Sequence, residues 1–118
     1  MIKIYHNPRC RKSREGLEII KESGKDFEIV EYLKNVPTKE ELISIIKTLN
    51  ISPTELVRKN ETVWKEDYKG KSLSEGKIIE AMIQNPKLIE RPIVINQNKA
   101  VVGRPPENIK TIIWFFFV

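Results

Sequence analysis

The chain has 118 residues, of which 40% are hydrophobic and 31% are charged, which suits one compact domain with a buried core and excludes a disordered or low-complexity chain. A single cysteine, Cys10, excludes an internal disulfide framework and a structural zinc site built from several cysteines. The net charge of +5 favours an anionic partner. Because the Lys and Arg residues are interleaved with Glu, we do not expect that partner to be a nucleic acid.

The sequence shows no signal peptide, and no apolar run approaches the roughly 18 residues that span a membrane. Together with one free cysteine, these features predict a protein of the reducing cytoplasm. The longest apolar run, 112–118, is expected to pack on the core of a monomer, although it could instead pair two chains.

The first part of the chain predicts a strand, a helix and a second strand. Residues 2–5 alternate between apolar and polar, and a polar break follows at 6–9. A helical pattern then covers 10–23 and ends at Gly24, and a second strand pattern covers 27–32. This order favours a parallel βαβ unit.

The middle of the chain, about 38–86, is predicted to be helical. Residues 38–41 form a capping box, and residues 52–55 repeat that signal with proline at the first helical position. Residues 72–75 open another helix, which stops at 85–86. The apolar residues expected on the buried faces of the first and last helices are Leu42, Ile45, Ile46, Leu49, Ile78, Ile79, Met82 and Ile83.

The strand pattern returns at 93–95 and 99–103, and the intervening turn at 96–98 predicts a β-hairpin. Residues 105–107 start a terminal helix. The complete order predicts an α/β, thioredoxin-like fold with a mixed four-stranded sheet, in which the helical stretch is an insertion within a single domain, 1–118. The inward positions of the terminal helix are Ile109, Ile112, Ile113 and Phe116.

Cys10 lies where the first predicted strand leads into the first helix. Unpaired N–H groups and the positive end of the helix dipole stabilise an anion there, and thiol pKa values fall in such places beside basic residues. His6 is one short turn away, and the Ser13 hydroxyl is placed to donate a hydrogen bond to the sulfur. The Cys-x-x-Ser motif therefore predicts a nucleophilic thiolate. The flanking cations are Arg9, Arg11, Lys12 and Arg14.

Two further features of the sequence restrict the reactions that this cysteine can carry out. Phosphatase-type anion loops carry an arginine six positions after the cysteine, and Gly16 at that position excludes such a loop. Because the chain has one cysteine, an oxidised or substrate-bound sulfur must be released by an outside thiol. We therefore expect a small thiol such as glutathione, or a redoxin protein, as partner.

Four sequence blocks, taken in their order along the chain, identify a protein family much more specifically than the Cys-x-x-Ser motif alone does. They are Ile4–Arg14, Glu55–Glu61, Arg91–Val94 and Gly103–Glu107. With these blocks, nearly the whole chain resembles the arsenate reductase family of thioredoxin-like proteins, of the glutaredoxin-dependent type.

The resemblance implies a cysteine nucleophile and three arginines that bind an oxyanion, for which guanidinium groups are suited because they make paired, charge-assisted hydrogen bonds. If the three arginines converge on the thiolate, they should also lower the pKa of the sulfur. It also implies arsenate as substrate, glutathione as co-substrate, glutaredoxin as partner, no bound cofactor and no metal. Arg11 stands where many relatives carry a small residue, so substrate access beside the cysteine could differ. The implied roles are nucleophile for Cys10, oxyanion binding for Arg58, Arg91 and Arg104, thiolate tuning for His6 and Ser13, and cis-proline for Pro92.

Two other functions fit the same superfamily. One is a regulator that binds RNA polymerase, and the other is a generic glutathione-dependent thiol reductase. Ser13 in place of a second cysteine counts against the redox switch of such regulators. The three oxyanion arginines count, more modestly, against the generic reductase.

Overall fold

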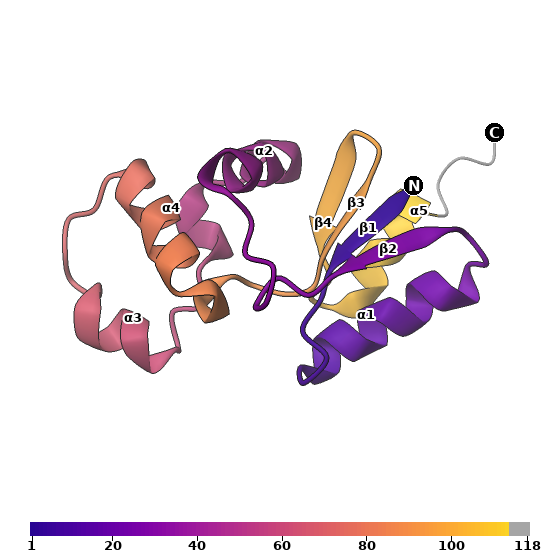
Figure 1. Cartoon of the computed structure of the whole chain (residues 1–118), viewed down its shortest axis with the longest axis horizontal. Coiled ribbons are helices and arrows are strands. Elements are labelled where there is room, and N and C mark those ends of the chain that lie inside the picture. The colour runs from indigo at the N-terminus through magenta and orange to yellow at the C-terminus, as the bar shows by residue number, and fades with distance from the viewer. Residues whose placement is uncertain (114–118) are drawn as a thin grey trace. The chain divides into compact units, whose positions relative to one another are not determined.

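The computed structural model of the chain describes residues 1–113, which fold into two compact units (Figure 1). The first unit contains residues 1–35 and the described residues from 91 onward, and the second spans 36–90. The expectations for Phe116 and for the packing of 114–118 lie outside the described residues. Across residues 1–113, every helix is too short or too polar to cross a membrane.

The first unit is built on a mixed four-stranded sheet of order β2-β1-β3-β4. β1 pairs in parallel with β2 and antiparallel with β3, and β3 pairs antiparallel with β4. Helix α1 makes the crossover between β1 and β2, so the predicted βαβ unit and hairpin are confirmed. The elements are β1 Ile2–Tyr5, α1 Arg11–Glu22, β2 Phe27–Val30, β3 Ile93–Asn96 and β4 Lys99–Val102.

One face of this sheet carries the core of the first unit. Side chains alternate between the two faces of a strand, so Ile2 and Ile4 of β1 point to the same side, where Val94 of β3 joins them. The chain's last described helices, η3 (Pro106–Ile109) and α5 (Lys110–Ile113), pack on that side with α1. The buried cluster consists of Ile2, Ile4, Ile20, Val94, Ile109, Ile112 and Ile113.

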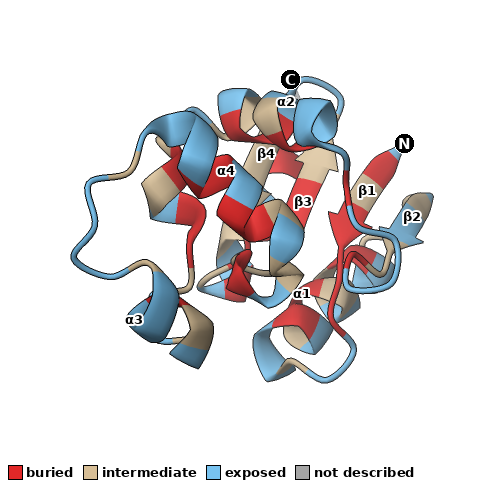
Figure 2. Cartoon of the chain, turned by 60° about the vertical axis from the view of Figure 1, so that its left-hand side comes forward, coloured by how far each residue is buried: buried red, intermediate tan, exposed pale blue. Residues whose placement is uncertain are grey.

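Strand β2 is shorter than the sequence predicted. It ends at Val30 rather than at residue 32, because its partner β1 ends at Tyr5, which is paired with Val30. The His6 N–H donates the last hydrogen bond to the Val30 carbonyl at 2.9 Å. β2 lies at the edge of the sheet and is much more exposed than β1 (Figure 2). Tyr32 is buried, but it lies outside the strand.

The β3–β4 hairpin turns more tightly than predicted. Asn96 belongs to β3, so the turn consists of Gln97 and Asn98, and Gln97 adopts a left-handed φ of 58°. The Asn96 side chain donates a hydrogen bond of 2.7 Å to the Ile112 carbonyl, which ties the hairpin to α5.

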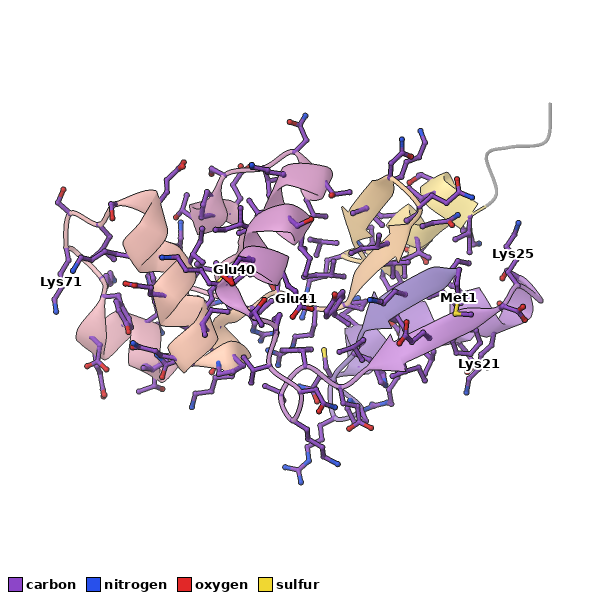
Figure 3. All side chains as sticks on the ribbon, turned by 45° about the horizontal axis from the view of Figure 1, so that its top comes forward. Met1, Lys21, Lys25, Glu40, Glu41 and Lys71 are labelled. Atoms are coloured by element: carbon purple, nitrogen blue, oxygen red, sulfur yellow. The ribbon has the colours of Figure 1, made fainter. Side chains whose placement is uncertain are left out.

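The second unit is helical, as predicted, and contains α2 and four shorter elements. The capping box at the start of α2 is confirmed: the Glu41 N–H donates to Thr38 Oγ1, and the Thr38 N–H donates to Glu41 Oε1, both at 3.1 Å. Figure 3 labels Glu40 and Glu41 in this first turn. The elements are α2 Lys39–Leu49, η1 Pro53–Leu56, α3 Thr62–Asp67, α4 Glu75–Gln84 and η2 Pro86–Leu88.

Three details of this unit differ from the sequence-based expectations. The signal at 52–55 does form a capping box, but the helix it starts is a single 3₁₀ turn. The last long helix is capped by Ser74 rather than starting at residue 72, and its end at 85–86 is as predicted. Helix α3 was not predicted, because at six residues it is too short to show a helical repeat of apolar residues.

Candidate active site

Cys10 is the N-cap residue of α1. Its backbone is extended, with φ −93° and ψ 124°, and its carbonyl accepts the Arg14 N–H at 3.0 Å. Its own N–H donates to the Asn7 carbonyl at 3.0 Å, which closes the turn between β1 and the helix. The thiol is partly exposed. The sequence therefore located the cysteine correctly at a helix N-terminus.

The pKa of the Cys10 thiol is lowered from its ordinary value. Partial burial is the largest single influence and raises this pKa, but it is outweighed by the combined effect of the backbone N–H of Ser13, the Arg91 side chain and the backbone N–H of Lys12. Arg91 acts both as a hydrogen-bond donor and as a positive charge. At neutral pH, a larger fraction of this thiol is therefore ionised than of a free cysteine, and the thiolate is the nucleophilic form.

Arg104 is the second guanidinium at the sulfur, with Nη2 3.9 Å from Cys10 Sγ. Arg91 precedes β3 and Arg104 follows β4, and antiparallel pairing of Ile93 with Val102 brings these two strand ends together. Each arginine is half-buried and precedes a cis-proline. The peptide bond before Pro92 is thus cis, as the family resemblance implied.

Three of the four cations that flank Cys10 in the sequence have partners other than the sulfur. Arg11 and Lys12 both form ion pairs with Glu15, at 3.5 Å and 3.9 Å. The Arg14 side chain donates to the Pro8 carbonyl at 3.0 Å. The cation that lowers the pKa of Cys10 is instead Arg91, which is distant in sequence.

The Ser13 hydroxyl has a different role from the one predicted. It lies 2.7 Å from His6 Nδ1 and accepts the Asn7 N–H at 3.0 Å, while it is the backbone N–H of Ser13 that reaches the sulfur. Ser13 is fully buried. Burial lowers the pKa of His6 and Glu31 opposes that effect, so the imidazole is largely neutral at pH 7. His6 thus acts on the cysteine turn through Ser13.

We predict that Ser13→Ala destabilises the protein by about 1–3 kcal/mol, because it leaves the buried Asn7 N–H and His6 Nδ1 without their partner. Urea unfolding measures the change. Ser44→Ala is the matched control, since Ser44 is an exposed serine within α2 and should change stability by less than about 0.5 kcal/mol. Equal stability of the two variants would contradict the role assigned to Ser13.

Sequence reasoning did not single out Asn7, which shapes the cysteine turn. Its side-chain Oδ1 accepts the Arg9 N–H at 3.0 Å, and its carbonyl accepts the Cys10 N–H. Asn7 is 8% exposed. An asparagine before proline at the start of a turn was the available signal, because its side chain can hydrogen-bond the backbone two residues on.

Arg58 lies in the second unit, held there by backbone pairing. Its N–H donates to the Leu88 carbonyl at 2.7 Å, next to an isolated bridge between Val57 and Ile89. Its guanidinium forms ion pairs with Glu61 at 3.4 Å and with Glu90 at 4.0 Å. That Arg58 shares one site with Arg91 and Arg104 stays a prediction.

The described geometry suits an anion better than a cation. Arg91 and Arg104 converge on a partly exposed sulfur at a helix N-terminus, where N–H groups also point at the thiol. Within residues 1–113, His, Cys, Asp and Glu side chains do not gather in any group of three or more that could hold a metal ion.

Comparison with known proteins agrees with this geometry. The model of the ArsC family matches residues 5–112. The chain is 47% identical to the Escherichia coli K12 protein YfgD, described as uncharacterised, over 95% of this chain and 96% of that protein. It is 39% identical to an arsenate reductase of Neisseria meningitidis serogroup B, over 95% of this chain and 97% of that protein.

A solved structure of an arsenate reductase from Vibrio cholerae is 40% identical and superposes with a TM-score of 0.91, covering 94% of this chain and 96% of that one. The fold is therefore the thioredoxin-like fold of arsenate reductases, as predicted. The chain belongs to the ArsC family.

Proposed function

We propose that this protein is an arsenate reductase-like oxidoreductase in which Cys10 is the nucleophile. The observation that carries the proposal is the contact between the Cys10 sulfur and two guanidinium groups, those of Arg91 and Arg104, at the N-terminus of α1. Membership of the ArsC family, with relatives described as arsenate reductases, supports the same chemistry.

Arsenate is a small tetrahedral oxyanion with charge on several oxygens. Arg91 and Arg104 would hold these oxygens by charge-assisted hydrogen bonds and would stabilise the charge that develops on them during attack. Arg58 is proposed as the third oxyanion-binding arginine. The same guanidinium groups favour the Cys10 thiolate, so one set of side chains both binds the substrate and activates the nucleophile.

In the proposed reaction, the Cys10 thiolate forms a sulfur–arsenic bond and one arsenate oxygen leaves as water after protonation. Two external thiols then supply two electrons, which reduce As(V) to As(III) as the thiols are oxidised to a disulfide. Water then displaces the Cys10 sulfur from As(III), which breaks the sulfur–arsenic bond, releases arsenite and returns Cys10 to the thiolate. Because the chain has one cysteine, it cannot supply the second thiol itself.

The external reductant is proposed to be glutathione, as co-substrate, with glutaredoxin as the protein that completes thiol exchange. This cycle needs no bound cofactor and operates in a reducing compartment such as the cytoplasm. A monomer suffices for it, because the proposed residues all belong to one chain.

The direct test is reduction of arsenate by the purified protein with glutathione and glutaredoxin, followed as arsenite formation. We expect turnover that requires both arsenate and the thiol. Reduction of a small disulfide substrate without any arsenite formation would contradict the proposal and support the generic thiol reductase instead.

A further inference from the structure

Two glycines of the first unit lie against the same pair of buried side chains. Gly16 is on the buried face of α1 that also carries Ser13, and Gly103 lies between β4 and Arg104. A Cβ at Gly16 would lie 2.8 Å from Ile109 Cδ1 and 3.0 Å from Pro92 Cγ. A Cβ at Gly103 would lie 2.8 Å from Pro92 Cγ and 3.0 Å from Ile109 Cδ1.

These distances leave no room for a methyl group at either position. Pro92 is a closed ring directly after Arg91, so its Cγ can shift only by a change of ring pucker or together with its backbone. Ile109 is fully buried in the core of the first unit, so its side-chain tip has little free space. A side chain on either glycine must therefore displace Pro92, Ile109 or both, and Pro92 is the direct neighbour of Arg91.

Both arginines at the sulfur are connected directly to this packing. The Gly103 N–H donates to the Pro92 carbonyl at 2.8 Å, which joins the segment of Arg104 to that of Arg91. Gly16, on the other side, belongs to the helix whose N-cap is Cys10. The close contact thus links the three segments that meet at the cysteine.

We propose that Gly16 and Gly103 are positioning residues that set Arg91 and Arg104 against Cys10 by allowing close packing around Pro92 and Ile109. The inference rests on the proposed action of the arginines at the thiolate. It also gives Gly16 a function of its own, because this position must be small for the helix to approach Pro92.

The test is Gly16→Ala, measured by the rate of Cys10 alkylation with iodoacetamide across a pH series, without arsenate. Displacement of Arg91 weakens the contact that lowers the pKa of Cys10, so the alkylation profile moves to higher pH. We expect alkylation at neutral pH to slow about threefold, as the thiolate fraction falls tenfold for each pH unit below the pKa. Gly103→Ala should move the profile in the same direction.

Gly76→Ala is the matched control. Gly76 is also a helical glycine, in α4, but a Cβ there would meet no atom within 4 Å beyond its chain neighbours and the backbone of its own helix. Its alkylation profile should equal that of the unchanged protein.

The double variant Gly16→Ala/Ile109→Val tests the mechanism, and it remains informative if Gly16→Ala alone folds poorly. Valine lacks the Cδ1 atom that the new methyl group would meet first. The pH profile of Cys10 alkylation should therefore move part of the way back toward that of the unchanged protein. An unchanged profile in folded Gly16→Ala and Gly103→Ala protein, with reduced thermal stability alone, would show a purely structural role and overturn the proposal.

The readout separates this inference from the proposed function. Shifted alkylation profiles in a protein that does not reduce arsenate would refute the substrate and retain the positioning role. Normal arsenate reduction with unshifted alkylation profiles in both glycine variants would refute the positioning role and retain arsenate as the substrate.

Discussion

Replacing Cys10 with serine is expected to lower thiol-dependent arsenate reduction by more than about a thousandfold, because a serine hydroxyl is hardly ionised at neutral pH and cannot replace the thiolate as nucleophile. Arsenite formation under the conditions that saturate the unchanged protein measures the loss. Since Cys10 is partly exposed and makes its turn contacts through the backbone, the variant should fold normally.

Cys10→Ala separates binding from chemistry. Both variants keep Arg91 and Arg104, so each should still bind arsenate or sulfate in calorimetry while forming no arsenite. Retained reductase activity in either variant would refute the nucleophilic role of Cys10. Loss of anion binding in both, with the fold intact, would indicate that the sulfur itself is part of the anion site.

Arg91→Gln is expected to have the second largest effect. It removes both the hydrogen bond and the positive charge that lower the pKa of Cys10, so the thiol titrates at higher pH and alkylation at neutral pH slows. It also removes one charged donor to the oxyanion, which should lower kcat/KM for arsenate by about 100-fold. The pH series of alkylation and the steady-state rates measure the two effects separately.

Arg11→Gln is the matched control for that variant. It removes the same formal charge from a residue adjacent to Cys10, but the Arg11 side chain is 83% exposed and is paired with Glu15. We expect its alkylation profile and kcat/KM to remain within about twofold of the unchanged protein, because exposed charges are strongly screened. Equal effects of the two substitutions would show that general positive charge, rather than contact by Arg91, activates the thiol.

Much of the fold could be predicted from local patterns. The alternation in β1, the apolar run in β3, the stop at Gly24 and the capping box at Thr38 each depend on residues close together in the sequence, and each is confirmed. The errors lie where tertiary context decides. Tyr32 continues the apolar pattern of β2, but the strand ends earlier because β1 offers no further partner.

Only part of the candidate site could be predicted, because local patterns can be read from the sequence and long-range contacts cannot. A helix start is a local event, so the place of Cys10 followed from the sequence. The direction of the Ser13 hydroxyl did not, because it depends on the positions of His6 and of the Asn7 backbone N–H after folding. The sequence offers the flanking cations as well as the three distant arginines for lowering the pKa of Cys10, but ion pairs with Glu15 engage two of the flanking cations.

The sequence by itself determined that one thiol lies at a helix N-terminus and must use an outside reductant, because both statements depend on short-range pattern and on a count of cysteines. The resemblance to a family named three candidate arginines for that thiol, and only the tertiary structure shows Arg91 and Arg104 in contact with it. Antiparallel pairing of β3 with β4 brings Arg91 and Arg104 to one end of the sheet, where close packing at Gly16 and Gly103 joins them to α1. Such contacts join residues far apart in the chain, and they form only when the backbone is folded.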